Sequence, residues 1–139
     1  RAWKGQVYAI EKKEDALALL KENRRKFATD NLEIVPGTAP EAMVELPVPT
    51  HAFIGGSSGN MNEIIRLLLD KNPKVRIVIN CITLETVTEA MNAIRDFSLT
   101  DVDIVQLSAA RSKSIGRYHM MMGENPIYII SCSGRGEEI

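Results

Sequence analysis

The stretch THAFIGGSSGN, residues 50–60, constrains the fold of this chain more than any other. A short apolar segment ends in the glycine-rich turn GGSSG, and a helix-like segment follows it. Open α/β sheets bind ligands where a parallel strand feeds a glycine-rich turn and then a helix, because bare backbone can approach a substrate or cofactor closely there. The stretch therefore predicts an α/β sheet with a binding edge at this turn, and an ordinary flexible turn is the alternative.

Strand-like and helix-like segments alternate along the whole chain. Strands are predicted at residues 6–10, 31–35, 50–54, 75–82, 101–109 and 127–131, and helices at 14–27, 60–69 and 83–98, with a short helix or turn at 40–46. Residues 75–82 are nearly all apolar, which predicts a central strand covered by helices on both faces. The last two strands have no helix between them, which predicts an antiparallel pair at one sheet edge, joined by a loop at 110–125.

Two of the helices have recognisable starts. Asn60 with Glu63 three residues later fits a capping box, and Thr83 with Thr86 nearby opens the third helix. The apolar residues of this third helix recur at helical spacing and are expected to face a core. They are Leu84, Val87, Met91, Ile94 and Phe97.

Length and charge narrow the class of protein. The 139 residues predict a single domain, residues 1–139, and the net charge of -1 comes from scattered charges of both signs. This pattern argues against nucleic-acid and membrane-surface binding and favours a small ligand. Cys81 and Cys132 belong to no CxxC or Cys/His cluster, so we expect buried thiols, no metal site and a reducing, cytoplasmic location.

Glu11, at the end of the first strand, is one candidate binding residue. A carboxylate there can accept hydrogen bonds from ribose hydroxyls, or it can simply favour the positive end of the following helix. After the second strand, Gly37 and Ala39 leave room for a flat ring, although an ordinary turn explains the same residues. The glycine turn at 55–59 fits neither GxxxxGK[ST] nor GxGxxG.

The segment at 110–125 gathers cations beside methionines. Arg111, Lys113 and Arg117 could bind carboxylates, and the three methionines at 120–122 could pack on a flat apolar face. The alternative is a solvated basic loop whose methionines are buried in the sheet or in a neighbouring subunit. His119 is the candidate acid or base, whereas His51 precedes an apolar strand and is expected to pack.

Taken in order, six segments of the chain carry a family resemblance. VYAIEKKEDAL, NLEIVPGTAPEAM, HAFIGGSSGNMNEII, RIVINCITLETV, DIVQLSAARSKSIGRYHMM and ENPIYII together resemble the decarboxylating precorrin-6Y methyltransferases of cobalamin biosynthesis. The resemblance runs over residues 7–130, and FIGGSSGN, NCITLET and SAARSKSIGRYHM are its most specific parts. Members of this family methylate C15 of a precorrin and remove the C12 acetate carboxyl as CO2, either as a subunit or as the C-terminal half of a fused enzyme.

The resemblance implies a class I S-adenosylmethionine methyltransferase fold, which is Rossmann-like and mostly parallel with an antiparallel last strand. Glu11 would bind the ribose of the cofactor. The adenine would lie against Gly37, Thr38 and Ala39. The methionine portion, and the S-adenosylhomocysteine product, would lie beside Ile54, Gly55 and Gly56.

A precorrin substrate with many carboxylates would face the remaining candidates. The resemblance implies Arg111 and His119 as catalytic residues, and it implies substrate binding by Asn80, Thr83, Lys113 and Arg117. It also implies a homo-oligomer, specifically a tetramer.

One motif of the family does not occur in the sequence. The glycine-rich D-x-G-x-G-x-G turn that cradles the cofactor is expected before residue 7, so the first strand and helix of the family's sheet are expected to be missing. Since that strand is central, its loss predicts that the strands at 6–10 and 50–54 are separated and that this chain binds S-adenosylmethionine weakly or not at all. Two alternatives remain: a non-catalytic methyltransferase-like domain that serves as an oligomer partner, and a small-molecule methyltransferase with another substrate.

Overall fold

The computed structural model describes residues 5–56 and 59–135. The chain forms two compact units, Arg1–Pro47 and Val48–Ile139, and each is described by itself. Ser57 and Ser58 of the predicted glycine turn lie outside the described residues.

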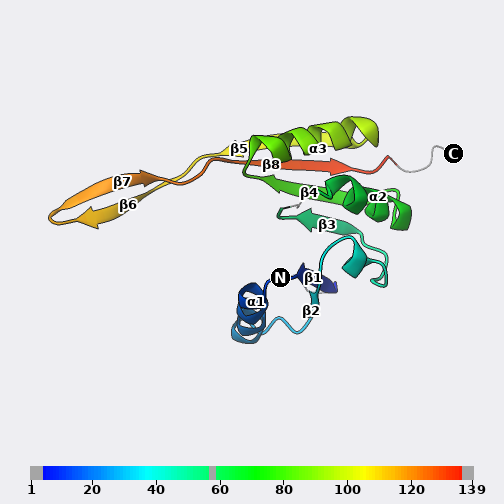
Figure 1. The fold of residues 1–139 in the computed structure, drawn as a ribbon, viewed down its shortest axis with the longest axis horizontal. Coiled ribbons are helices and arrows are strands. Elements are labelled where there is room, and N and C mark those ends of the chain that lie inside the picture. Colours follow the sequence, from blue (N-terminus) through cyan, green and yellow to red (C-terminus); the bar gives the residue numbers. More distant parts are fainter. Residues whose placement is uncertain (1–4, 57–58, 136–139) are drawn as a thin grey trace. The chain divides into compact units, whose positions relative to one another are not determined.

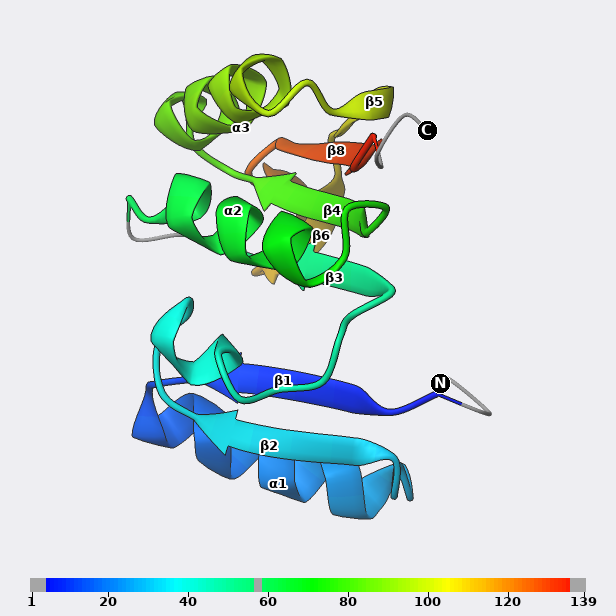
Figure 2. The same ribbon diagram turned by 90° about the vertical axis from the view of Figure 1, so that its right-hand side faces the viewer.

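The first unit is a strand–helix–strand arrangement. β1 (Val7–Glu11) pairs in parallel with β2 (Leu32–Pro36), and α1 (Glu14–Lys26) connects them (Figure 2). α1 carries acidic residues in its first turn and basic residues in its last, which suits the helix dipole. The short 3-10 helix η1 (Glu41–Met43) follows β2. The two predicted strands and the predicted helix are confirmed to within one residue, and η1 is shorter than the segment predicted at 40–46.

The second unit contains a four-stranded sheet in the order β3-β4-β8-β5. Its strands are β3 (His51–Ile54), β4 (Arg76–Cys81), β5 (Thr100–Leu107) and β8 (Ile127–Ser133). β3 and β4 are parallel, and β8 lies antiparallel between β4 and β5. The predictions of an interior strand at 75–82 and an antiparallel final strand are therefore confirmed, and the two strands predicted to be separated, β1 and β3, belong to different sheets.

Both helices of this unit, α2 (Met61–Lys71) and α3 (Leu84–Asp96), lie on one face of the sheet (Figures 1 and 2). The core between these helices and the sheet includes the fully buried Ile65 of α2, Ile77 of β4 and Ile130 of β8. Cys81 and Cys132 are buried free thiols, as predicted, and burial raises the pKa of each. β4 alternates between buried and half-buried residues, so the prediction of helices on both faces is wrong for the described part of this unit.

Two details of the helices also differ from prediction. Asn60 occupies the N-cap position of α2, but its side chain makes no capping hydrogen bond, because its backbone (φ -116°, ψ 23°) is not extended as in a side-chain cap. Thr83 is extended and does cap α3, accepting the Thr86 N–H. In the predicted stripe of α3, Leu84 and Met91 are exposed, at 75% and 43%.

The buried residues of α3 are instead Ala90 and Ala93. α3 packs against β4 and β8, and small side chains permit a helix to approach a sheet closely.

Residues 110–125 are not a loop. They form a hairpin of β6 (Ala110–Ile115) and β7 (Tyr118–Gly123), which we call the arm, and it extends away from the four-stranded sheet (Figure 1). The strands are joined by Gly116 and Arg117, with Gly116 at φ +59°, a conformation that favours glycine in a two-residue turn. Every residue of the arm is exposed, so its methionines are not buried in the sheet of their own chain.

Candidate functional site

Glu11 holds its carboxylate at the carboxyl end of β1. Its Oε1 accepts the Lys12 N–H at 2.8 Å and the Lys13 N–H at 2.9 Å. These amides, with Lys13 contributing most, hold the pKa of Glu11 below its usual value. Both bonds use Oε1, so Glu11 serves the start of α1, as one alternative predicted, while Oε2 is available to accept hydrogen bonds from a ligand.

The turn after β2 lies directly beside Glu11. The Gly37 N–H donates to the Glu11 carbonyl oxygen at 3.0 Å, and the Ala42 N–H donates to the Thr38 carbonyl oxygen at 2.9 Å. Gly37 has φ +144°, and a Cβ there would lie 3.1 Å from the Cβ of Ala42, so glycine is strongly favoured. The structure thus brings together Glu11, Gly37, Thr38 and Ala39, four of the predicted cofactor residues.

A second group lies where β3 and β4 end. Ile54 is buried and pairs with Ile79, so Gly55 leaves the sheet next to Asn80. Asn80 Oδ1 is buried and has no hydrogen-bond partner among the described residues. Buried acceptors normally have a donor, so this oxygen is suited to receive one from a ligand.

Two further candidates flank this edge. A Cβ on Gly56 would meet nothing within 4 Å, so the backbone there is open. The Thr83 hydroxyl is already engaged at the start of α3, where it accepts the Thr86 N–H at 3.1 Å and lies 2.8 Å from Thr86 Oγ1.

The register of the arm sorts its side chains onto two faces, because directly opposite residues of an antiparallel pair share a face. Arg111 lies opposite Met122 and Lys113 opposite Met120, and we call this side the cationic face. On the other side, the small-residue face, His119 lies opposite Ser114. The two residues predicted to be catalytic, Arg111 and His119, therefore lie on opposite faces.

Arg117 lies in the turn at the tip of the arm. Its guanidinium carbon is 5.7 Å from the centroid of the Tyr118 ring, a cation–π distance.

Sequence reasoning missed the role of Arg76. Its guanidinium donates to Ser131 Oγ at 2.9 Å, to Ser133 Oγ at 3.0 Å and to the Asp101 carbonyl oxygen at 3.1 Å. The available signal was an arginine in a strand whose other residues, apart from Asn80, are apolar. The prediction that His51 packs is wrong, since His51 is exposed at the start of β3 with Nδ1 3.0 Å from Thr50 Oγ1.

The described residues form neither a metal-binding cluster nor a helix that could span a membrane. Among them, no group of three or more His, Cys, Asp or Glu side chains could hold a metal ion. None of the described helices combines the length and the apolar character needed to cross a bilayer.

Comparison with known proteins decides the family. A family model described as the precorrin methyltransferase domain matches residues 1–133. The chain belongs to this family. Among curated proteins, the chain is similar to a probable cobalt-precorrin-6B C(15)-methyltransferase (decarboxylating) of Methanothermobacter thermautotrophicus, which is 38% identical over 89% of this chain and 65% of its own length. The corresponding Salmonella typhimurium protein is 34% identical over 91% of this chain and 66% of its own length.

A solved structure supports the same assignment. The precorrin-6y C5,15-methyltransferase of Geobacter metallireducens matches with a TM-score of 0.82 and 33% identity, covering 93% of this chain and 68% of that one. The fold is the Rossmann-like fold of class I S-adenosylmethionine methyltransferases, as predicted. The chain spans just under two thirds of the length of the curated relatives, 64–66%.

Proposed function

We propose that the protein transfers a methyl group from S-adenosylmethionine to C15 of a precorrin and removes the C12 acetate carboxyl as CO2. The observation that carries this proposal is the family match over residues 1–133. The relatives named for this reaction, at 34–38% identity, support it.

The cofactor residues are proposed from the edges described above. S-adenosylmethionine supplies the methyl group and leaves as S-adenosylhomocysteine. Glu11 is ionised at neutral pH and offers acceptors only, so its Oε2 suits ribose hydroxyls. The backbone at Gly37, Thr38 and Ala39 lines the adenine, while Ile54, Gly55 and Gly56 lie beside the methionine portion.

The substrate residues are proposed from the arm and from the end of β4. Arg111 and Lys113 bind carboxylates of the precorrin, and Met120 and Met122 on the same face pack against its flat ring. Arg117 binds a carboxylate at the tip. Asn80 and Thr83 contact substrate at the sheet edge, and His119 serves as acid or base for a group that reaches the small-residue face.

The reaction requires positioning more than covalent chemistry from these residues. In methyl transfer the sulfur–carbon bond breaks as the new carbon–carbon bond to C15 forms, so an in-line approach supplies most of the acceleration. In decarboxylation the bond between the acetate methylene and its carboxylate breaks, CO2 leaves, and the electron pair passes into the conjugated ring. Arg111 holds the acetate carboxylate in place for this step.

Charge reversal on the cationic face tests the substrate assignment. Arg111→Glu is expected to weaken binding of uroporphyrin, a planar polycarboxylate, by about tenfold or more, because an attractive ion pair becomes repulsive. Affinity for S-adenosylhomocysteine should not change. Lys74→Glu, at an exposed residue away from the arm, makes the same change in net charge and is the control. Equal uroporphyrin affinities for the two variants would contradict the assignment.

We also propose that the protein is a homo-oligomer, specifically a tetramer. The exposed apolar side chains of the arm support self-association, since contiguous exposed apolar patches mark interaction sites. Ile115, Tyr118, Met120, Met121 and Met122 are 45–68% exposed.

A further inference from the structure

Polar and apolar residues divide one face of the four-stranded sheet. The buried residues of β4 and β8, which include Ile79 and Ile130, lie on the face that carries α2 and α3. Side chains alternate between the two faces of a strand, so the residues between the buried ones belong to the second face. On this second face β8 presents Ser133, Ser131, Ile129 and Ile127, and β5 presents Asp103, Val105 and Leu107. The second face is therefore polar where β8 ends and apolar where β8 begins.

The apolar half lies at the edge of the sheet from which the arm extends. β4 and β5 are both antiparallel to β8, so they run in the same direction as each other and as β3. The carboxyl ends of these three strands therefore share one edge, and β5 continues into the arm there (Figure 1). This is also the edge at which Ile54 and Asn80 lie near the ends of β3 and β4.

Five apolar side chains form a continuous band along this edge. Val105 lies opposite Ile129, and Leu107 lies opposite Ile127. Ile82 comes directly after the last paired residue of β4, which places it level with Ile127. These five residues, which we call the apolar band, cross three strands and therefore span about 10 Å.

The apolar band is accessible to a ligand. Ile82, Val105 and Leu107 are 42–56% exposed, and Ile127 and Ile129 are half-buried. Single exposed apolar residues are normal on a protein surface, but a contiguous patch marks a ligand-binding or interaction site. Because the same face is polar at the other end of β5 and β8, the patch is confined to the edge where the cofactor is proposed to bind.

Asn80 and the arm indicate the kind of ligand that covers the band. Asn80 lies opposite Ile129 and beside Gly55, and its buried Oδ1 has no donor among the described residues. Such an acceptor needs an N–H or O–H group. The arm leaves the same edge with Arg111 and Lys113, which suit carboxylates. A flat apolar ring that carries N–H donors and carboxylate side chains meets all three requirements, and a tetrapyrrole is such a molecule.

We propose that the precorrin ring packs against the apolar band at its reacting end, beside Gly55 and the proposed methionine portion of the cofactor. The arm holds the carboxylates of the substrate, and the band holds the flat part of the ring that carries C15. The band thus orients C15 toward the methyl group through apolar contact rather than through charge. The inference rests on the precorrin reaction proposed above and adds the residues that position its substrate.

The test compares two substitutions on β5. Leu107→Asn removes an apolar contact from the band, whereas Ile104→Asn makes the same kind of change on the opposite face of the strand. The two side chains are matched in exposure, at 49% and 45%. Uroporphyrin should bind the Leu107→Asn variant of the whole protein about fivefold more weakly, because the ring no longer covers apolar surface there. Ile104→Asn should bind uroporphyrin like the unmodified protein.

Salt distinguishes this contact from the charged ones. The loss of affinity caused by Leu107→Asn should be equal at about 0.1 M and about 1 M salt, because salt does not screen an apolar contact. The loss caused by Arg111→Glu should shrink over the same range. A loss at Leu107 that disappears at high salt would contradict the apolar contact.

The outcomes separate the band from the proposed function. Equal affinities of the Leu107→Asn and Ile104→Asn variants would overturn the band, whereas a loss caused by Arg111→Glu in the same experiment would leave the precorrin substrate in place. An unmodified protein that does not bind uroporphyrin would overturn the substrate assignment, and the band with it. Ile82→Asn lies outside the strands and should show the same fivefold loss, so it replaces Leu107→Asn if a urea titration finds that variant poorly folded.

Discussion

Glu11 connects a local feature of the fold with the proposed cofactor site. Glu11→Gln keeps an acceptor but loses the charge, so S-adenosylhomocysteine should bind the whole protein about tenfold more weakly, as hydrogen bonds to charged groups are the stronger ones. Glu14→Gln, three residues further on at the start of α1, is the matched control. Calorimetry that finds the two variants equal in affinity would remove Glu11 from the cofactor site.

The two amide bonds at Glu11 also make folding dependent on pH. Since they lower the pKa of the folded carboxyl, their contribution is complete above its usual unfolded value of 4.5 and is lost as the pH falls through the lowered folded value. Glu11→Gln should therefore lower the stability near neutrality, where this contribution is complete, and reduce the loss of stability over the acidic range. A midpoint of acid unfolding that is unchanged by the substitution would contradict this origin.

Gly134 is a residue at which nothing larger fits. Its N–H donates to the Val75 carbonyl oxygen at 3.0 Å, and an added Cβ would overlap the Pro73 carbonyl oxygen and lie 2.7 Å from Leu69 Cδ2. Gly134→Ala should lower the free energy of unfolding by about 3 kcal/mol, as overpacking against backbone cannot relax cheaply. Gly56→Ala, where a Cβ meets nothing within 4 Å, should be close to neutral in the same urea titration. Similar losses for both would contradict the steric explanation.

At the scale of the elements, the side chain of Arg76 links three neighbouring strands, β4, β8 and β5, through hydrogen bonds. Arg76 of β4 donates to two hydroxyls of β8 and to the carbonyl oxygen of Asp101, where the pairing of β5 with β8 is interrupted by a register shift. Arg76→Met keeps the aliphatic stem and loses these bonds, so the free energy of unfolding should fall by about 2 kcal/mol.

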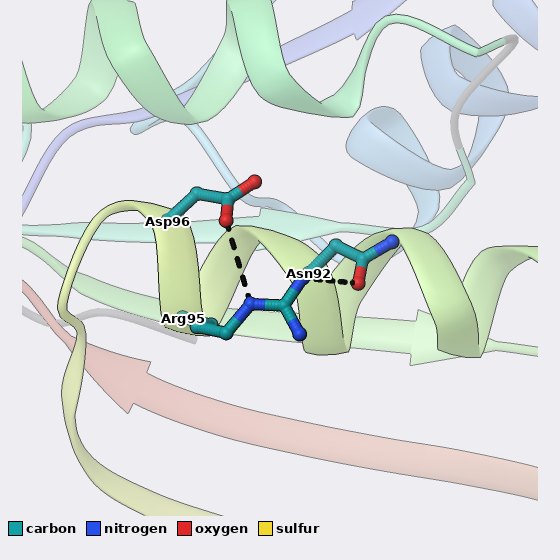
Figure 3. Close-up of polar contacts among 3 residues, drawn as sticks. All are labelled: Asn92, Arg95 and Asp96. Atoms are coloured by element: carbon teal, nitrogen blue, oxygen red, sulfur yellow. Dashed lines mark hydrogen bonds and ion pairs between the residues drawn. The ribbon is translucent and has the colours of Figure 1, made fainter.

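Arg95 is the matched control for Arg76. Arg95 lies near the end of α3. Its Nη2 donates to Asn92 Oδ1 at 3.0 Å, and its Nε lies 3.6 Å from Asp96 Oδ1 (Figure 3). The side chains of Arg95 and Asp96 are 76% and 56% exposed, so Arg95→Met should cost less than about 0.5 kcal/mol. If the two arginine variants unfold at the same urea concentration, Arg76 does not stabilise the sheet as described.

The elements also show what a sequence pattern can and cannot predict. The strand at residues 76–81 was predictable because burial of alternate residues leaves an apolar run. The strand at residues 51–54 was predictable from its apolar run as well, although only Ile54 of it is buried. The arm was not, because neither of its faces is buried in its own chain and Ser, Lys and Met alternate without an apolar period. The available signal was Gly116 in a two-residue turn between two segments of equal length.

For α3, the predicted apolar stripe consists of large side chains, whereas the residues that are buried in the structure are two alanines. Helix periodicity predicts which direction faces the sheet, but the distance between helix and sheet decides whether leucine or alanine fits. Ala90 and Ala93 fill that position, while Leu84 remains exposed.

At the scale of the whole molecule, the family followed from the order of six segments, whereas the site followed only in part. Sequence position was enough to place Glu11 beside the turn at Gly37, because both end parallel strands that pair with each other. It could not show that Arg111 and His119 lie on opposite faces, since this depends on a strand register that the sequence does not reveal.

The proposed function is tested most directly by following both products of one reaction. The whole protein is incubated with S-adenosylmethionine labelled in its methyl group and with a precorrin labelled in its C12 acetate carboxyl. The proposal predicts that label enters the tetrapyrrole at C15 and that labelled CO2 is released in an equal amount. Transfer to C15 without CO2, or no transfer to a precorrin under conditions in which S-adenosylmethionine is bound, would contradict it.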